Sequence, residues 1–193
     1  MHRQELLSLL YNYQTPYIEE AGMVAKTRHF ILQNENCFDR NLSVGHVSGS
    51  SWVVNPARTH VLLLHHRKLG MWLQPGGHAD GDPDILRVIL KETSEETGIP
   101  YEHIYLLDNN IFDIDVHTVH ESAHDIRHTH YDIRFLVEID DALPIPGNNE
   151  SHDICWVALH EVSKFNNVLS LHRLMRKTLS LSKWQPPKIK LAY

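Results

Sequence analysis

The chain has 193 residues, of which 42% are apolar, and a formal net charge of −6. This length suffices for one domain with its own core and an added subdomain. The acidic balance argues against a nucleic-acid polymer as a partner, because such binders usually carry a basic excess. No segment approaches the roughly 18 consecutive apolar residues of a membrane helix, and the N-terminus lacks the pattern of a secretory signal. We therefore expect a cytoplasmic protein without membrane contact, for which a homodimer is one possible assembly.

Residues 1–42 are expected to form a helical extension packed on a main domain of residues 43–193. Residues 2–11 are rich in leucine and have a short amphipathic pattern, and residues 17–34 continue with apolar residues at helical spacing. The apolar residues of this second helix are Ile18, Ala21, Ala25 and Ile31. No linker rich in Gly, Pro or Ser separates the extension from the main domain.

The main domain begins with strands. Residues 45–56 alternate and end in an Asn-Pro turn signal. Residues 59–66 form a nearly continuous apolar run, which indicates a strand buried on both faces. Residues 72–75 read as a short strand, after which Gly76 and Gly77 would let the backbone turn tightly.

A helix is predicted from Asp82, as N-cap, to Gly98, as left-handed C-cap. Pro83 would take its first position. An apolar stripe must face the sheet, and its residues are Ile85, Leu86, Ile89 and Leu90.

Further strands are predicted at residues 103–108, 112–120, 127–140 and 154–159, followed by a helix at about 168–181. The order of strands and helices predicts a mixed β-sheet between helices, an α/β/α sandwich.

Three carboxylates, Glu92, Glu95 and Glu96, occupy neighbouring positions on one face of the predicted helix. Like charges at this spacing destabilise a helix. The cluster therefore suggests a multivalent cation, and hard carboxylate oxygens suit Mg²⁺ or Mn²⁺. The alternative is a solvated, Glu-rich helix end.

The run from Gly77 to Ile99 resembles the Nudix box, and the preceding LGMWLQPGGH is similar to the lead-in of that family and of isopentenyl diphosphate isomerase, which shares its fold. The positions in register are Gly77, Glu92, Glu95, Glu96, Gly98 and Ile99. Three positions depart: Pro83 replaces a Glu, Lys91 an Arg and Thr93 an apolar residue. Lys91 cannot reproduce the bidentate fork of Arg, and Asp82 or Asp84 could supply the missing carboxylate.

The resemblance implies a Nudix-type fold and hydrolysis of a diphosphate linkage in a nucleoside diphosphate derivative, a small-molecule substrate, with Mg²⁺ or Mn²⁺ as cofactor. It implies metal ligation by Glu92, Glu95, Glu96 and the backbone carbonyl of Gly77. For the general base it leaves open Glu95, Glu96 and Glu150, the last from a later loop. The substrate stays open among ADP-ribose, dinucleoside polyphosphates, nucleoside triphosphates and nucleotide sugars.

The chain contains 16 histidines, many of them between Asp113 and Asp132. Period two places Asp113, Asp115 and His117 on one face of their strand. On the next strand it groups His128, His130, Asp132 and Arg134. If the two strands pair, they form a polar wall. The residues that we expect to bind substrate are His78, Asp115, His117, His130, Asp132 and Arg134. The alternatives are a solvated sheet face and a transition-metal site.

Two other functions remain as alternatives. An isomerase of the isopentenyl diphosphate type would need a catalytic Cys in an Asn-Thr-Cys-Cys-like segment, which neither Cys37 nor Cys155 matches. These two cysteines also form no disulfide framework. A catalytically weak Nudix-fold ligand-binding module is suggested by Pro83 and Lys91, whereas the intact carboxylates argue against it.

Overall fold

A computed structural model describes residues 3–119, 127–181 and 189. Its helices are α1 (Gln4–Asn12), α2 (Ile18–Gln33), α3 (Ile85–Thr97), η1 (Tyr101–His103), η2 (Leu159–Glu161), α4 (Val162–Phe165) and α5 (Leu169–Ser180). Its strands are β1 (Gly45–Val54), β2 (His60–His66), β3 (Met71–Leu73), β4 (Gly76–His78), β5 (Tyr105–Leu106), β6 (Asp113–Val119), β7 (His128–Glu138) and β8 (Ser151–Ala158). No helix in the described ranges is long and apolar enough to cross a membrane.

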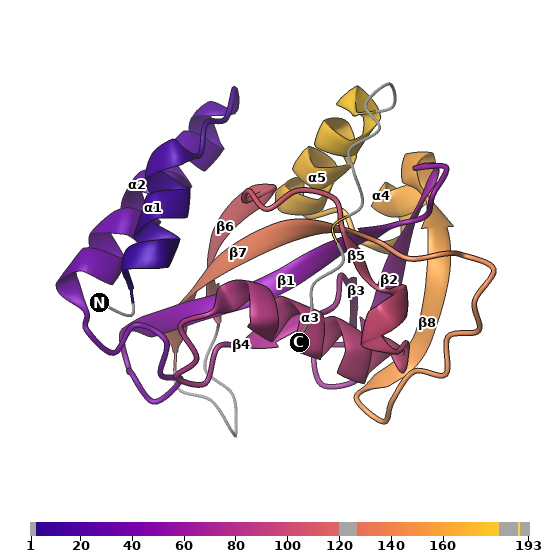
Figure 1. Ribbon diagram of the computed structural model, residues 1–193, viewed down its shortest axis with the longest axis horizontal. Coiled ribbons are helices and arrows are strands. Elements are labelled where there is room, and N and C mark those ends of the chain that lie inside the picture. Colours follow the sequence, from indigo (N-terminus) through magenta and orange to yellow (C-terminus); the bar gives the residue numbers. More distant parts are fainter. Residues whose placement is uncertain (1–2, 120–126, 182–188, 190–193) are drawn as a thin grey trace.

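The strands form one mixed sheet with the order β3-β2-β1-β7-β5 (Figure 1). β1 and β7 run parallel along the whole of β1, whereas the other strand pairs are antiparallel. β4 pairs with β1, β6 with β7, and β8 with β2. β1 meets β2 only at Val54↔Val61, and β4 pairs with β1 farther towards its start.

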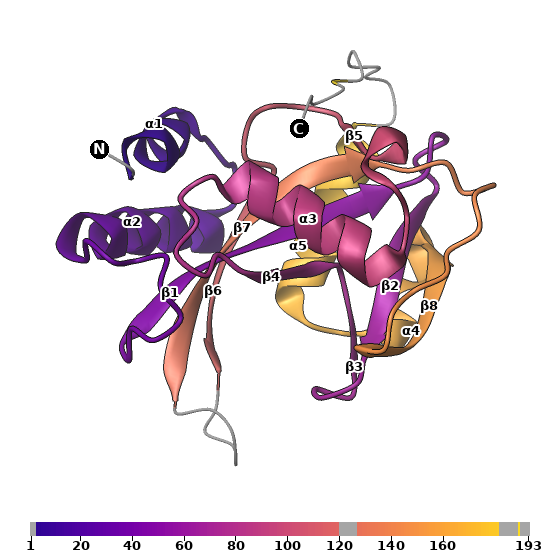
Figure 2. The ribbon, with the colours of Figure 1, turned by 60° about the horizontal axis from the view of Figure 1, so that its bottom comes forward.

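Helices cover both faces of the sheet, so the predicted α/β/α sandwich is confirmed (Figure 2). Val47, Ile133 and Phe135 share a core with α3. Trp52 of β1 and Leu136 of β7 share a second core with α5. Side chains alternate along a strand, so odd-numbered residues of β1 and β7 face α3 and even-numbered ones face α5.

The N-terminal helices share the α3-side core through Leu6, Leu10 and Ile31, and Phe30 stacks on Tyr131 at 4.0 Å. The apolar face predicted for α2 is wrong except at Ile31. Ile18 is 88% exposed, and Ala21 and Ala25 also face solvent. The face that packs includes polar residues, because Glu20 meets the buried Arg173 and the partly buried Lys177 of α5.

The start of α3 also differs from the prediction. Asp84, rather than Asp82, is the N-cap, and its side chain accepts a hydrogen bond of 3.0 Å from the Arg87 amide. Asp82 instead pairs with the Arg87 guanidinium. The two carboxylates therefore act together on the first turn. At the other end Gly98 is left-handed, with φ 71°, as predicted.

Gly76 and Gly77 do not make a tight turn but form β4, opposite Ser50 and Gly49 of β1. The structure requires glycine at position 76 for another reason, the close approach of β1. A Cβ on Gly76 would lie 2.4 Å from the Ser50 Cβ and 2.7 Å from the Gly49 carbonyl oxygen. A side chain is therefore excluded by the neighbouring strand.

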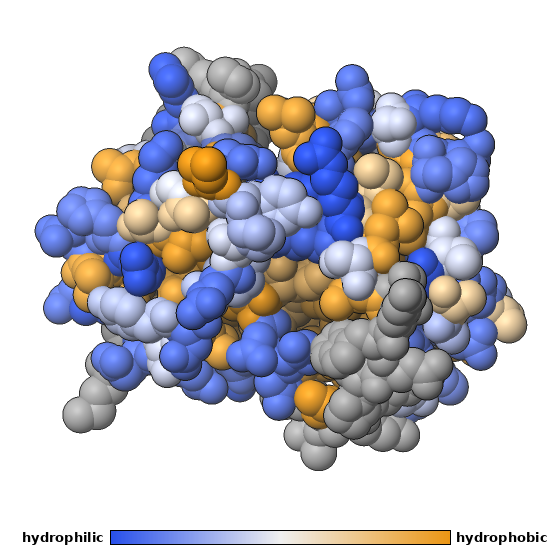
Figure 3. All heavy atoms as spheres, turned by 90° about the horizontal axis from the view of Figure 1, so that it is seen from above, coloured by the Kyte–Doolittle hydropathy of each residue, from blue (hydrophilic) through white to orange (hydrophobic). Residues whose placement is uncertain are grey.

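The remaining strand predictions differ mainly in length. The strand predicted at residues 103–108 is a short helix, η1, and the two-residue β5. β8 begins at Ser151, before the predicted start at residue 154. β6 follows the prediction up to Val119, and residue 120 lies outside the described residues. On the face drawn in Figure 3, apolar side chains lie scattered among hydrophilic ones.

Replacing Gly76 by Ala should reduce the free energy of unfolding by about 1–3 kcal/mol, because the methyl group overlaps the backbone of β1. Urea unfolding measures this change. Gly22→Ala is the matched control, since no atom lies within 4 Å of the added methyl group. It should stabilise α2 by up to about 1 kcal/mol. Equal effects of the two substitutions would contradict the predicted packing.

Candidate active site

The box carboxylates lie on α3, where they meet β4. Glu96 is 4% exposed, and its Oε2 accepts a hydrogen bond of 2.8 Å from the Gly76 amide. Glu92 lies directly against Gly77, since a Cβ there would be 2.5 Å from the Glu92 Oε2. Glu95 is exposed. The two glycines thus let two carboxylates approach the backbone of β4.

Lys91 faces two of these carboxylates. Its Nζ lies 3.5 Å from Glu92 Oε1 and 3.4 Å from Glu95 Oε2. Burial lowers the pKa of Lys91, but the charges of Glu92 and Glu95 raise it by more, so the amine stays protonated. Lys91 therefore offers one point charge at the position where an Arg fork would orient the acidic groups.

The carboxylates are poorly compensated by the protein. Burial raises the pKa of Glu96 to about 8, and the charges of Glu92, Glu150 and Glu95 add to this against the opposing effect of the Gly76 amide. Burial also raises the pKa of Glu92, where Lys91 only partly offsets it. A bound cation would favour the ionised form of each group.

The donor set fits a hard divalent cation, because it consists of carboxylate oxygens beside a backbone carbonyl. These donor atoms are, however, spread apart. Among residues 3–119, 127–181 and 189, a group of histidines is the one set of three or more acidic, His or Cys ligands whose atoms all lie within 4.8 Å of one another. The box carboxylates are not gathered that closely.

Glu150 is brought towards this cluster by the loop before β8. The Gly147 amide donates a hydrogen bond of 2.9 Å to the Thr97 carbonyl at the end of α3, and the Arg67 amide donates one of 2.9 Å to the Glu150 carbonyl. The charge of Glu150 raises the pKa of both Glu92 and Glu96. Glu150 is itself exposed to solvent.

The two alternating strands pair as the polar-wall prediction requires. Asp115 is opposite Asp132, and His117 is opposite His130. The alternative of a solvated sheet face is wrong for the charged residues of the polar wall. Asp115, Asp132 and Arg134 are only 7%, 5% and 3% exposed. Being even-numbered on β7, Asp132 and Arg134 face α5, and α3 with its carboxylates covers the other side.

Arg134 is saturated by its neighbours. Its Nε donates to Asp132 at 2.7 Å, and its terminal nitrogens lie 3.4 Å from Asp113 and 3.4 Å from Asp115. Ser50 also donates to Asp132 at 2.8 Å. A phosphate would have to displace one of these partners, so substrate binding by these residues stays a prediction.

α5 supplies two further cations to the same network. Arg173 forms two hydrogen bonds of 2.8 Å with Asp113, and Lys177 lies 2.7 Å from Asp113 and 2.5 Å from Glu20. Burial would raise the pKa of Asp113, but the Arg173 hydrogen bond and the charges of Arg134 and Lys177 lower it below its usual value. The polar wall and these residues thus form one charge network, in which Glu20, Arg173 and Lys177 carry no sequence signal that links them to the strands.

Four imidazoles gather beside this network. They belong to His46 of β1, His78 of β4, and His128 and His130 of β7. Burial lowers the pKa of His130 to about 2 and that of His46 to about 4, with the neighbouring histidines adding to both shifts. His117 lies at the margin, 3.0 Å from Asp115. The sequence does not reveal His46 as a member of this group, because its place opposite His130 depends on the parallel pairing of β1 and β7.

A family model described as the NUDIX domain matches residues 46–179, more than half of the chain. The chain belongs to the Nudix family. The matched region begins at the His46 position and ends within α5, so it contains the sheet, the box helix and most of the buried charge network. The helices α1 and α2 lie outside it.

Solved Nudix-type structures share the fold. An Ap4A hydrolase of C. elegans has a TM-score of 0.52 at 19% identity, covering 70% of this chain and 96% of its own. The dihydroneopterin triphosphate pyrophosphohydrolase of E. coli has a TM-score of 0.56 at 16% identity, covering 68% and 92%. A Nudix hydrolase of M. smegmatis has 0.53 at 16% identity, covering 77% and 90%. The comparison with curated proteins finds no match.

Replacing Arg173 by Met should reduce the free energy of unfolding by about 3 kcal/mol or more, because Asp113 would lose its bidentate partner in a buried site. Arg176→Met, at an exposed position of the same helix, should change it by no more than about 0.5 kcal/mol. Denaturant unfolding of both variants gives the comparison. A small decrease in the free energy of unfolding of Arg173→Met would contradict this prediction, because the other cations would then be enough to compensate Asp113.

Asp115 should make the free energy of unfolding decrease at acidic pH. Burial would raise its pKa, but the hydrogen bond with His117 and the charges of Arg134 and Arg173 lower it to about 2. A lowered pKa stabilises the folded state above the unfolded value, and this contribution disappears as pH falls through the folded value. The difference in free energy of unfolding between the wild type and Asp115→Asn should therefore decrease by about 2 kcal/mol as the pH falls from 4 to 2. Unfolding curves at several pH values test this, with exposed Asp153→Asn as control, and a constant difference would contradict it.

Proposed function

We propose that this Nudix protein hydrolyses a diphosphate linkage in a nucleoside diphosphate derivative, with Mg²⁺ or Mn²⁺ held by Glu92, Glu95, Glu96 and the Gly77 carbonyl. The observation that carries the proposal is the contact between α3 and β4. Gly76 binds one oxygen of Glu96, and Glu92 rests on Gly77. Two carboxylates thereby lie against the backbone of β4, and carboxylate and carbonyl oxygens are the donors that hard cations prefer.

Each residue has a proposed part in the reaction. When bound, the ion neutralises diphosphate charge and makes water a stronger acid. Glu96 is oriented by the Gly76 amide, and Lys91 restrains Glu92 and Glu95. Glu150 is the proposed general base because its loop is fastened to the end of α3. Glu95 and Glu96 are the alternatives for that role.

Substrate contact is proposed for the polar residues beside β4. They are His78, Asp115, His117, His130, Asp132 and Arg134. The His117 side chain is the accessible end of this group, at 46% exposed, compared with 10% for Asp115 and 4% for Arg134. A substrate that also reaches the box must cross β4, which pairs with β1 alone among the described strands. We therefore expect His117 to lie nearest the substrate.

Two other functions receive less support. A thiol-dependent isomerase would need a reactive Cys, but burial raises the pKa of Cys37 to about 11 and also raises that of Cys155. A thiolate is therefore disfavoured at both positions. A ligand-binding module would retain the fold without turnover. Lys91, which stands at the Arg position, motivates that possibility, and its contacts with Glu92 and Glu95 argue against a disabled site.

Glu92→Gln and Glu96→Gln should each lower kcat/KM by about 10²-fold or more, since a metal contributes several kcal/mol to charge stabilisation. Folding should be retained, because Gln at position 96 can still accept from the Gly76 amide. The substrates to test are dinucleoside polyphosphates, ADP-ribose, nucleoside triphosphates and nucleotide sugars with Mg²⁺ or Mn²⁺. Phosphate release after phosphatase coupling is the readout.

Glu102→Gln, an exposed residue of η1, is the matched control and should keep full activity. Full activity of the Glu96→Gln variant would contradict the assignment of Glu96 to the metal site. Tight binding of a member of the panel without turnover of any member would instead favour the ligand-binding module.

A further inference from the structure

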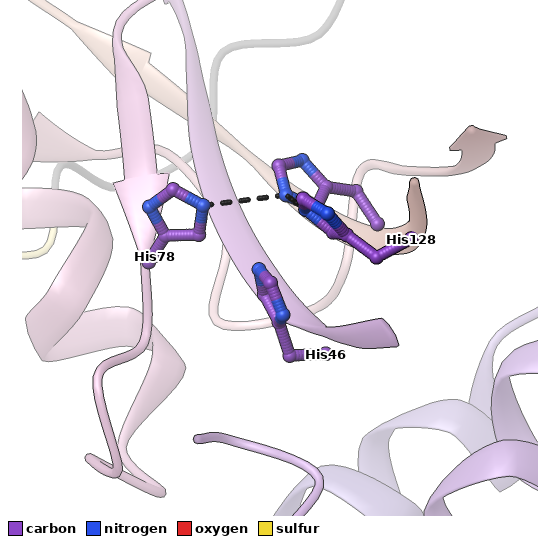
Figure 4. A group of neighbouring side chains, drawn as sticks. His46, His78 and His128 are labelled. Atoms are coloured by element: carbon purple, nitrogen blue, oxygen red, sulfur yellow. Dashed lines mark hydrogen bonds between the residues drawn. The ribbon is translucent and has the colours of Figure 1, made fainter. Parts of the chain in front are cut away.

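We propose that His46, His78, His128 and His130 form a binding site for a transition-metal ion of the Zn²⁺ class, separate from the carboxylates of α3. The four rings come from three strands, β1, β4 and β7, and their candidate nitrogen atoms all lie within 4.8 Å of one another. Figure 4 shows the labelled rings of His46, His78 and His128 pointing towards one another. The proposal does not depend on the proposed hydrolase activity, but an ion bound here would take His78 and His130 out of the set proposed for substrate contact.

The spacing of the nitrogens suits a small metal ion. His130 Nε2 lies 3.3 Å from His78 Nε2 and 2.9 Å from His128 Nε2. Bonds of about 2.0–2.1 Å to a shared ion, at angles between a right angle and the tetrahedral one, put ligand nitrogens about 2.9–3.4 Å apart. Two of the three separations among these nitrogens are therefore already those of ligands around one ion.

His46 provides an independent observation. Its side chain is buried, at 2% exposed, and neither Nδ1 nor Nε2 has a hydrogen-bond partner among the described residues. A buried polar group without a partner is destabilising and needs an explanation. The centroid of its ring lies 4.9 Å from that of His78 and 4.8 Å from that of His128. An ion between the rings would give this imidazole a partner.

The ligand type selects the class of metal. Imidazole nitrogens suit Zn²⁺, Cu²⁺, Ni²⁺ and Co²⁺, whereas Mg²⁺ prefers oxygen ligands. Four nitrogens without an intervening carboxylate match a closed tetrahedral Zn²⁺ site more closely than a catalytic one, which keeps a position open. Millimolar Mg²⁺ should therefore leave this site to the transition metal.

The site would stabilise a short strand that pairs with one neighbour. β4 has three residues and is bonded to β1 alone in the described sheet. A metal ion on His78 would tie β4 to His46 of β1 and to His128 and His130 of β7. Gly77, the preceding residue, would be fixed at the same time. The ion would act as a cross-link of three strands.

Co²⁺ spectroscopy of the wild type tests the site directly. The protein is purified without a histidine tag, stripped with a chelator and titrated with Co²⁺ in the presence of Mg²⁺. We expect one equivalent to produce the intense visible absorption of tetrahedral cobalt, and one equivalent of Zn²⁺ to abolish it. At about 100-fold excess of Zn²⁺ over its Kd, the melting temperature should rise by about 5–10 °C. Absence of the tetrahedral spectrum in the folded wild type would overturn the proposal.

Variants locate the ion. The double variant His78→Gln and His128→Gln should bind Zn²⁺ about tenfold more weakly or worse and should lose the tetrahedral cobalt spectrum. His103→Gln, an exposed histidine of η1, should match the wild type. Glu96→Gln should keep the spectrum, because the carboxylates are not ligands here. Unchanged affinity and spectrum in the double variant would assign the ion to another site and overturn the proposal.

Discussion

The burial of Asp113 is the constraint on which the arrangement of this fold depends. A carboxylate with no exposed surface must be paired. Arg173 and Lys177 of α5 provide the partners, and Lys177 joins Glu20 of α2 to the same group. The N-terminal extension, the sheet and the C-terminal helix are therefore held together by charges that none of them could bury alone. This explains why α2 packs through a face that contains Glu20 and leaves apolar Ile18 in solvent.

The same constraint separates the polar wall from the box. Asp132 and Arg134 neutralise each other on the α5 side of the sheet. On the α3 side, Lys91 offsets the charge of Glu92 only partly, and Glu96 has no cationic partner among the described residues. A buried polar or charged group that its protein neighbours do not fully satisfy is the feature that distinguishes a ligand site from a structural network. By that criterion the carboxylates of α3 and the unpartnered His46 stand out, and the buried Arg134 does not.

Periodicity and spacing predicted much of this structure. Alternation placed Asp115 and His117 on one face, and the box spacing placed Glu92, Glu95 and Glu96 on one helix. Alternation does not reveal what covers a face, so the cations of α5 could not be foreseen from β6 and β7. Nor does a strand pattern specify its neighbours. His46 meets His130 only because β1 and β7 run parallel across a long separation in sequence, which no local signal contains.

Successive residues of β4 belong to the two proposed ion sites, and strand geometry keeps those sites apart. Gly77 meets Glu92 of α3, so the alternation of side chains turns His78 away from α3 and towards His130. One set offers hard oxygens and the other offers imidazole nitrogens, which prefer different metals. Position on the strand and ligand chemistry therefore both keep the two ion sites distinct. A metal bound at the histidines would fix the backbone of β4 without competing for the carboxylates, and so would hold the Gly77 carbonyl in place for the other ion.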